Sequence, residues 1–298
     1  MDLKNILVVA KLTKYEFDQY HLHLKPAQVL EKYRKEGIDA QRILNSHERQ
    51  KKALQRLKDI LGGKNFISRD EFTRKKAAEV DLVISFGGDN HFQYLSHFLE
   101  KTPLLGINSD PVKSEGALTS VPADKIERVV ERLKKEQFSV ESWTRLSAQV
   151  NGEKVTLATS EYFLGERDRE EMSRHILEFQ GKKEEQKGSG ILVATGIGSM
   201  GWYHSACRFL HPSGDIFPQD APFAKFLLTE PHKGNESKCN LFNGVLRKGE
   251  KLVLHSLNDA EGRLSVDSWI HYPFNRGANV EIRLADLPLK VVKISQKL

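Results

Sequence analysis

The residues with the clearest chemical potential form a short turn, Gly87-Gly88-Asp89, directly after the apolar run Leu82–Phe86. An apolar run with β-branched residues that closes on two glycines is typical of a buried strand, and glycines let a ligand approach the main chain closely. Apolar residues then recur at helical spacing from Phe92 to Leu99, so the turn is expected to join a strand to a helix. Free N–H groups at a helix start favour phosphate, and a carboxylate among them suggests chemistry on a phosphorylated substrate. A tight turn in which Asp89 only caps the helix is the alternative.

A second group of polar residues follows the next short apolar run, Pro103–Ile107. Asn108 and Ser109 can direct hydrogen-bond donors and acceptors into a crevice at the end of that strand. An ordinary Asx turn made rigid by Pro111 also explains the pattern.

A third group combines glycines with hydroxyl residues between Ser189 and Ser205. In the loop Thr195-Gly196-Ile197-Gly198-Ser199, backbone N–H groups and hydroxyls can wrap a phosphate, although loops of this composition are common. Trp202 and Ser205 follow the loop closely enough to share a site with it.

Glu161 is a candidate for binding a sugar. With Ser160 it follows the expected strand Val155–Ala158, and its carboxylate can accept hydrogen bonds from ribose hydroxyls. A surface glutamate looks the same in sequence. Residues Asp267–Trp269, after another expected strand, fit either an approach to the site or an exposed turn.

The elements up to about residue 123 alternate between strands and helices. This βαβ alternation predicts a doubly wound parallel sheet, whose ligand crevice lies outside the carboxyl ends of the strands. Asp89 and Asn108 both fall at such ends. The expected strands are Ile6–Ala10, Leu82–Phe86 and Pro103–Ile107; the expected helices are Ala27–Lys35, Ala53–Leu61, Thr73–Glu79 and the segment after Asp89, with a polar turn around Lys14.

The pattern changes after a helix expected around Ala123–Glu136. Short strands separated by turn residues, with Asn151-Gly152 as a hairpin turn, predict an antiparallel β-rich domain. We therefore expect an α/β fold with an α/β domain over residues 1–123 and a β-rich domain over 124–284, the tail 285–298 being able to pack back on the first. The strands expected in the second domain are Thr144–Val150, Val155–Ala158, His175–Phe179, Ile191–Ala194, Lys251–Ser256, Arg263–Val266 and Asn279–Leu284.

Charge narrows the range of partners. The 298 residues carry a formal net charge of +6, from 46 basic and 40 acidic residues, which suits an anionic metabolite. Dense basic tracts with interleaved aromatic residues are absent, which disfavours nucleic acid as a partner. The basic stretch Lys182–Lys187 is expected to be a solvated hairpin tip rather than a binding site.

The compartment follows from the cysteines and from the apolar runs. Cys207 and Cys239 cannot form a disulfide framework, which favours a reducing environment. No apolar run approaches the ~18–20 residues that span a bilayer, and a strand beginning at Ile6 leaves no room for a signal peptide. A cytoplasmic protein without membrane contact is expected. His204, Cys207 and His211 share a helical face, but without a fourth ligand a core role is preferred to a zinc site, and no protein metal site is expected.

Taken in this order, the motifs resemble the NAD kinase family, in the variant found in mitochondria and in related bacterial proteins. The resemblance covers nearly the whole chain. The Gly-Gly-Asp turn is shared with lipid kinases and is moderately specific by itself; its combination with the segment Asn108–Gly116 is much more specific. The further matching segments are Ala10–Phe17, Phe163–Glu166, Lys187–Gly190 and Thr229–Pro231, together with Glu161 and the Thr195–Ser199 loop.

The resemblance implies transfer of the γ-phosphoryl group of ATP, which brings Mg²⁺ with it, to the adenosine-ribose 2′-hydroxyl of NAD, giving NADP. It implies Asp89 as the catalytic residue, which accepts the hydroxyl proton and orients the hydroxyl. Glu161 would hold ribose hydroxyls, and Thr195, Ser199 and Ser205 would line the adenine and phosphate region. It also implies a homodimer. The residues expected to bind NAD and ATP are Gly87, Gly88, Asn90, Asn108, Ser109, Ser160, Glu161, Ser189, Thr195, Gly196, Gly198, Ser199, Trp202 and Ser205.

The chain departs from the family pattern next to the catalytic position. The family usually has Gly and then Thr after the catalytic Asp, where this chain has Asn90 and His91. Asn tolerates left-handed backbone angles, so Asn90 is expected to preserve the turn, and His91 is expected to be an ordinary helix residue rather than a phosphate donor. Trp202 replaces a tyrosine and can still stack on a base. Two rival functions stay open: a non-catalytic NAD(P)-binding protein, and a kinase of another hydroxyl substrate such as a lipid.

Overall fold

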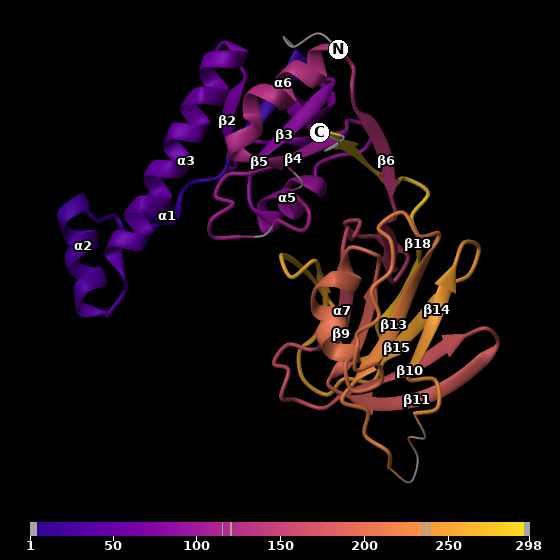
Figure 1. Ribbon diagram of the computed structural model, residues 1–298. Coiled ribbons are helices and arrows are strands. Elements are labelled where there is room, and N and C mark those ends of the chain that lie inside the picture. Colours follow the sequence, from indigo (N-terminus) through magenta and orange to yellow (C-terminus); the bar gives the residue numbers. More distant parts are fainter. Residues whose placement is uncertain (1–4, 115, 120, 235–236, 238, 295–298) are drawn as a thin grey trace. The chain divides into compact units, whose positions relative to one another are not determined.

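The computed structural model describes residues 5–114, 116–119, 121–234, 237 and 239–294. The chain folds into two compact units, one comprising Met1–Glu141 with Lys290–Leu298 and the other comprising Ser142–Leu289. In Figure 1 the first unit is drawn mainly in indigo to magenta and the second mainly in orange.

A sheet with parallel strands forms the centre of the first unit. Strands β1 to β4 pair in parallel, in a register that aligns Ala10 with both Ser68 and Phe86. The last strand of the chain, β19, also joins β4 in parallel. The order across the sheet is β2 (Phe66–Ser68), β1 (Ile6–Ala10), β3 (Leu82–Gly87), β4 (Leu104–Asn108), β19 (Leu289–Lys293) and β6 (Ser139–Trp143), and β5 (Val121–Pro122) pairs with β4 outside this path.

Helices cover both faces of this sheet. Alternate residues of a strand point to opposite faces. On one face, Ile84 of β3 packs in an apolar core with Leu57 and Val130 from two helices, whereas on the other face Gly87 lies against the ring of His91. The doubly wound arrangement is therefore confirmed. The helices are α1 (Lys14–Leu22), α2 (Pro26–Lys35), α3 (Ala40–Leu61), α4 (Arg74–Ala78), α5 (Asp89–Ser96), the 3₁₀ turn η2 (Ala123–Lys125) and α6 (Ile126–Lys134).

Residues around Lys14 form helix α1, so the predicted polar turn is wrong. Thr13 Oγ1 accepts a hydrogen bond from the N–H of Glu16 at 3.2 Å, and the Glu16 carboxylate accepts one from the N–H of Thr13 at 3.0 Å. This capping box fixes the helix start. The sequence of this helix has little apolar periodicity; its aromatic residues Phe17 and Tyr20 are exposed, and its buried residue is Asp18. In Figure 1, α1 and α2 lie at one end of the unit, away from the sheet.

The boundary between the units lies at Glu141 and not near residue 123, so helix α6 belongs to the first unit. Its apolar residues Ile126, Val129 and Leu133 are buried in the core of that unit. The sequence analysis placed the boundary before α6, because the apolar periodicity of this helix does not show which of the two units it packs against. Beyond Leu289 the chain returns to the first unit through β19.

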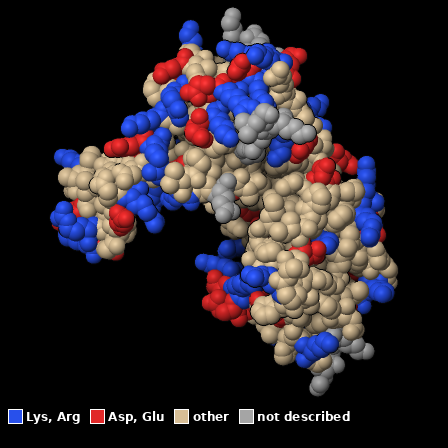
Figure 2. Space-filling model, in the orientation of Figure 1, with Lys and Arg blue, Asp and Glu red and all other residues tan. Residues whose placement is uncertain are grey.

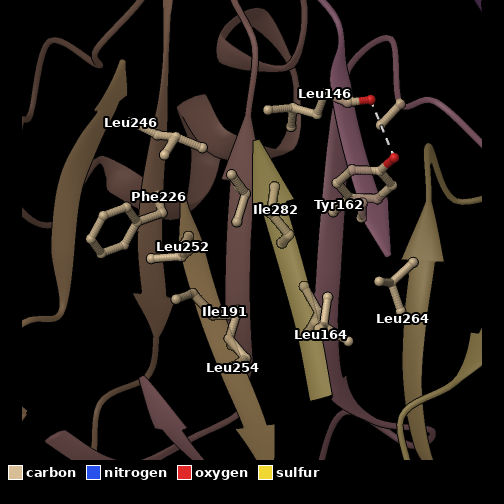
Figure 3. Close-up of a cluster of buried hydrophobic side chains, with 14 of the residues drawn as sticks. Leu146, Tyr162, Leu164, Ile191, Phe226, Leu246, Leu252, Leu254, Leu264 and Ile282 are labelled. Carbon is tan, nitrogen blue, oxygen red and sulfur yellow. Dashed lines mark hydrogen bonds between the residues drawn. The ribbon is translucent and has the colours of Figure 1, made fainter. Parts of the chain in front are cut away.

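The second unit consists of two antiparallel sheets that share one apolar core. Figure 3 shows side chains of both sheets in this core, among them Leu254 and Ile282 from one sheet and Leu164 and Ile191 from the other. One sheet has the order β11 (Lys182–Gly188), β10 (Ser173–Phe179), β15 (Leu252–Ser256), β18 (Asn279–Leu284), β7 (Leu146–Val150) and β8 (Glu153–Lys154). The other has the order β14 (Asn243–Arg247), β13 (Phe223–Thr229), β12 (Gly190–Ala194), β9 (Glu161–Glu166), β16 (Gly262–Val266) and β17 (Ile270–Pro273).

Two local predictions for this unit are wrong. Residues Lys182–Lys187 form most of strand β11, and the hairpin tip lies before them, at Gln180 and Gly181, which both have positive φ. Residues Val155–Ala158 are not a strand; the hairpin partner of β7 is β8, at Glu153–Lys154. In both places the pairing depends on where the turn falls, which the apolar pattern does not specify.

Charges of both signs are interleaved on the surface. Over the first unit, Figure 2 shows Lys and Arg side chains next to Asp and Glu rather than a field of one sign. Within the described residues, none of the helices is both long enough and apolar enough to cross a membrane.

Candidate functional site

The Gly87–Asp89 turn lies between β3 and α5, where the sequence predicts it. Strand β3 is buried over its whole length, and α5 begins at Asp89 with Gly88 as its N-cap residue. Because Gly88 has no side chain, it provides no cap for the first N–H groups of the helix. Such N–H groups at the carboxyl edge of a parallel sheet are suited to bind an anion.

His91 explains why residue 87 has to be small. A Cβ atom at Gly87 would lie 2.8 Å from the His91 ring, which packs directly on the main chain of the turn. The ring is fully buried, and its Nε2 lies 3.0 Å from the carbonyl oxygen of Val9. Burial lowers the pKa of His91 to about 4, so the ring is neutral near pH 7. The interpretation of His91 as a helix residue that does not donate to phosphate is supported.

Asn90 does not need the left-handed backbone that the sequence suggested. It is the second residue of α5 and is exposed, and its φ is not positive. The turn is made instead by the extended backbone of Gly88, with φ −106° and ψ −174°. The expectation about Asn90 is therefore wrong, and the replacement of glycine there is compatible with regular helix geometry.

The Asp89 carboxylate is held by four hydrogen bonds from the segment Ala117–Thr119. Its Oδ1 accepts bonds from the N–H of Leu118 at 2.9 Å and from the N–H and hydroxyl of Thr119 at 3.0 and 3.1 Å. Its Oδ2 accepts one bond, from the N–H of Ala117 at 2.9 Å. Oδ2 accepts one hydrogen bond where Oδ1 accepts three, so Oδ2 retains acceptor capacity. The geometry fixes the orientation of Asp89 and leaves this oxygen able to take a proton from a substrate hydroxyl.

Asn108 and Ser109 are committed to bonds within the first unit. Asn108 Oδ1 accepts the N–H of Asp110 at 3.1 Å, which is the Asx turn, and Asn108 Nδ2 donates to the carbonyl of Ser114 at 2.8 Å. Ser109 donates its N–H to Gly87 at 3.0 Å and its hydroxyl to Gln50 at 2.9 Å. Both residues therefore lie beside the glycine turn and hold the loop that follows β4.

Sequence reasoning missed the partner of Asp110. This carboxylate is nearly fully buried and accepts hydrogen bonds from Arg49 Nε at 3.0 Å, from Arg49 Nη2 at 3.1 Å and from the hydroxyl of Ser46. Both partners come from α3. A sequence signal for this ion pair is absent, because the two sides are about 60 residues apart.

In the second unit, the hydroxyls of Thr195 and Ser199 donate to main-chain carbonyl groups. Thr195 Oγ1 donates to the carbonyl of Thr159 at 2.7 Å, and Ser199 Oγ donates to the carbonyl of Gly196 at 2.7 Å. Both hydroxyls are fully buried. Gly196 is required because a Cβ there would lie 1.9 Å from the carbonyl oxygen of Pro218. In this structure Thr195 and Ser199 shape the loop rather than face a ligand.

Asp267 organises the segment that carries Ser160 and Glu161. It has a positive φ of 49°, is 1% exposed, and accepts hydrogen bonds at 2.8 Å from the N–H groups of Thr159, Ser160 and Glu161. Of the two interpretations left open for Asp267–Trp269, the exposed turn does not hold for Asp267. The residue supports the candidate site through the main chain.

The Glu161 carboxyl is the buried acid of the second unit. The residue is 8% exposed, and a Cβ at Gly198 would lie 2.9 Å from its Oε2, so the carboxyl faces the glycine loop. Burial, and then the charge of Asp267, raise the pKa of Glu161 to about 8. Among the described residues, no side-chain hydrogen bond to this carboxyl is found. A buried carboxyl without such a bond is a ready acceptor for ligand hydroxyls.

Trp202 and Ser205 line a cavity of about 690 Å³ within the second unit. The Trp202 ring stacks on Phe163 with centroids 4.7 Å apart, and the Arg169 guanidinium lies 5.2 Å from its centroid. Glu230 forms an ion pair with Arg169 at 2.8 Å and a hydrogen bond with the side chain of Ser189. The cavity is lined mainly by apolar and aromatic groups, as expected for the binding of a flat ring system.

No protein-family model matches the chain. A protein of Oryza sativa subsp. japonica described as a probable NADH kinase is 25% identical over 244 residues, which span 74% of this chain and 73% of the rice protein. An NAD kinase of Saccharolobus solfataricus is 33% identical over 132 residues, covering 44% of this chain and half of the archaeal protein. NAD kinase 2, mitochondrial, of Rattus norvegicus is 23% identical over 66% of this chain and 59% of its own length.

A solved structure has a similar fold. The crystal structure of an NAD kinase from Archaeoglobus fulgidus in complex with ATP matches 98% of this chain and 94% of its own, with a TM-score of 0.63 and 16% identity. The chain is thus similar to NAD kinases in sequence and in fold. The structural match at this identity concerns the fold.

The structure places the predicted site residues in two groups, one in each unit. The first unit holds Gly87, Gly88, Asp89, Asn90, Asn108 and Ser109 at the carboxyl ends of β3 and β4. The second unit holds Ser160, Glu161, Ser189, Thr195, Gly196, Gly198, Ser199, Trp202 and Ser205 around β9, β12 and α7. Within the described part of the chain, no cluster of three or more His, Cys, Asp or Glu residues could hold a metal ion.

Proposed function

We propose that the chain is an ATP-dependent NAD kinase, which transfers the γ-phosphoryl group of ATP to the 2′-hydroxyl of the adenosine ribose of NAD and releases NADP and ADP. The observation that carries the proposal is the Asp89 carboxylate, fixed by Ala117–Thr119 at the end of a glycine turn. The names of the relatives support NAD and ATP as the substrates.

The chemistry follows from the two oxygens of Asp89. The 2′-hydroxyl donates to Oδ2, its oxygen attacks the γ-phosphorus, the bond to the bridging oxygen of ADP breaks, and the hydroxyl proton passes to Oδ2. Phosphoryl-transfer transition states are loose, so alignment matters more than the strength of the base. A carboxylate locked by four hydrogen bonds meets this need, because it loses little freedom when the hydroxyl binds.

The chain contributes little to metal binding. Its described acidic residues do not form a metal cluster, and Mg²⁺ prefers to keep several waters and to bind substrate phosphates. The residues present therefore do not fit a resident Mg²⁺ site, and we propose that Mg²⁺ arrives with ATP.

The test is NADP formation by the purified chain with NAD, ATP and Mg²⁺, read by a coupled NADP-specific dehydrogenase. Asp89→Asn keeps the size of the side chain and removes its proton acceptor; we expect kcat to fall at least about 100-fold. Asp70→Asn, an exposed carboxylate in the same unit, is the matched control and should keep full activity. Equal rates in the two variants would contradict a catalytic Asp89.

The same assay decides between the remaining candidates. NADH is tested as a second acceptor, because the rice protein that matches 74% of this chain is described as a probable NADH kinase. Binding of NAD or NADP without turnover would identify a non-catalytic binding protein. Lack of both would direct the search to other hydroxyl acceptors, lipids included.

We also propose that the enzyme acts in the cytoplasm as a homodimer. Buried, unpaired Cys207 and Cys239 support a reducing compartment, and the family resemblance supports the dimer. Light scattering of the purified protein measures its mass in solution, and a mass of one chain would contradict the dimer.

A further inference from the structure

Strand register places two cations beside the glycine turn of the first unit. Ala10 pairs with Ser68 on one side and with Phe86 on the other. The next residues along these three strands are Lys11, Arg69 and Gly87, and neighbouring strands lie about 4.8 Å apart. The N–H of Lys11 donates to the carbonyl of Phe86 at 3.1 Å, which ties this residue to the strand that ends in the turn.

A third cation reaches the same place from the loop after β4. Lys113 is held in a turn by a hydrogen bond from its N–H to the carbonyl of Asp110 at 3.0 Å. Partial burial, and then the charges of Arg69 and Lys113, lower the pKa of Lys11. The three side chains, named here the basic cluster, are thus close enough to repel one another.

The two lysines of the basic cluster form no ion pair with a carboxylate in the part of the chain that the structure describes. Among the described residues, no ion pair involves Lys11 or Lys113, and no acidic group contributes to the pKa of Lys11. The nearest acid of the loop, Asp110, is occupied by Arg49. Like charges that lie close together raise the free energy of the folded protein, and an anion that binds among them reduces this cost.

The guanidinium of Arg69 is held in place by an aromatic ring. Its guanidinium stacks on the ring of Tyr94, in α5, with 3.4 Å between the guanidinium carbon and the ring centroid. Stacking of this kind fixes the plane of the guanidinium and reduces the entropy lost when it binds phosphate oxygens. The stacking partner lies on the helix whose N-terminal N–H groups face the same edge of the sheet.

We infer that Lys11, Arg69 and Lys113 bind the triphosphate of the phosphoryl donor and position it over the Gly87–Asp89 turn; this inference rests on the proposed kinase function. A triphosphate carries several charges along a chain of three phosphorus atoms, which matches two cations just beyond the ends of β1 and β2 and a third in the loop after β4. The cluster would neutralise charge on the transferred group and on the leaving diphosphate, while Asp89 handles the acceptor hydroxyl.

The test uses inorganic tripolyphosphate as the probe, titrated into the full chain in a calorimeter at fixed ionic strength. Lys11→Gln and Lys113→Gln should each weaken binding about tenfold, because each removes one charge-assisted hydrogen bond. Lys75→Gln, which removes an exposed lysine of α4 in the same unit, is the matched control and should leave the dissociation constant unchanged. Lys113 is exposed, so its variant is expected to fold, and a melting curve for each variant checks this.

The outcomes separate the inference from the proposed function. Asp89→Asn should lose NADP formation and still bind tripolyphosphate. Loss of tripolyphosphate binding in both lysine variants supports the basic cluster even if the wild-type chain does not phosphorylate NAD. The inference would be overturned if the wild-type chain did not bind the probe. It would also be overturned if the lysine variants of an active enzyme kept both the binding and the KM for ATP of the wild type. The kinase function would then be judged by the NADP-formation assay alone.

Discussion

Two carboxyl groups of the candidate site differ in a way that their residue types do not reveal. Asp89 is surrounded by hydrogen-bond donors, four of which bind it. Glu161 is buried beside a second acid, Asp267, and its pKa is raised to about 8. Donors stabilise a carboxylate, whereas burial and a like charge disfavour it. Glu161 therefore holds its proton until a ligand or a higher pH removes it, whereas the hydrogen bonds to Asp89 fix the orientation of its carboxylate.

The raised pKa of Glu161 predicts a stability change with pH. In the unfolded chain this carboxyl ionises above its ordinary pKa of 4.5, whereas in the folded chain it stays protonated up to about pH 8. The unfolded state is thus favoured progressively as the pH rises from 4.5 to 8, and the effect is constant above pH 8. Glu161→Gln removes it, so the second unit should melt higher than the wild type by about 5–10 °C at pH 8 and by little at pH 4.5.

Calorimetric melts from pH 4.5 to 9 check this prediction. Glu153→Gln, an exposed residue of β8 in the same unit, should show no such trend. A Glu161→Gln advantage that does not grow with pH would show that the wild-type carboxyl is already ionised in the folded state.

At the scale of elements, the loop after β4 depends on helix α3. Arg49 binds the carboxylate of Asp110 through two nitrogens, and Asp110 in turn closes the Asx turn of Asn108. The loop that carries Ser109 and Lys113 is thereby fixed against a helix far away in sequence. The same pair explains why the carboxylate of Asp110 is unavailable to Lys113.

Arg49→Met should therefore loosen this loop. The substitution keeps most of the apolar stem and leaves the buried Asp110 carboxylate with Ser46 as its remaining side-chain partner. Because Arg49 is itself 41% exposed, the loss of stability should be about 1–3 kcal/mol, below the value for a fully buried pair. Urea denaturation measures it. Arg49→Lys keeps the charge but loses the two-nitrogen contact with Asp110, so its loss of stability should be smaller than that of Arg49→Met. Lys52→Met, at an exposed position of the same helix, should leave stability unchanged. An Arg49→Met variant as stable as the wild type would show that the Arg49–Asp110 pair does not hold the loop.

Elements with strong local signals were predicted well from sequence. The buried run of β3, the strand-to-helix turn at Gly87–Asp89 and the stop of α3 at Gly62 all follow from residue types within a few positions. Strand β11 was missed because its sequence, mostly Lys, Glu and Gln, has low strand propensity, and its place is determined by pairing along β10. The donors to Asp89 lie 28–30 residues away, so the sequence could suggest the acid and not what holds it.

At the scale of the whole molecule, the second unit is an insertion into the first. The chain leaves the first sheet through β6 and returns to it through β19, which lies between β4 and β6 in the strand order. Val291 and Val292 of β19 are fully buried there. An interior strand of the first sheet is thus supplied by residues that follow the second unit in the sequence.

Val292→Ala should accordingly weaken the first unit alone, by about 1–3 kcal/mol for the cavity it leaves. Hydrogen exchange should then be faster in β4 and β6 and unchanged in β12. Val266→Ala, an equally buried valine of the second unit, should give the reverse pattern. Faster exchange in both units of either variant would show that they unfold together.

The position of β19 also has a consequence for biosynthesis. Domains generally fold as units and in order as they leave the ribosome, but here β4 and β6 emerge long before the strand that separates them in the finished sheet. Both sheets of the second unit can be complete while the nascent first unit still carries open strand edges, which are prone to unwanted pairing. The part of the chain made first is therefore the part finished last, and protection of that open sheet during translation becomes a requirement for producing the protein.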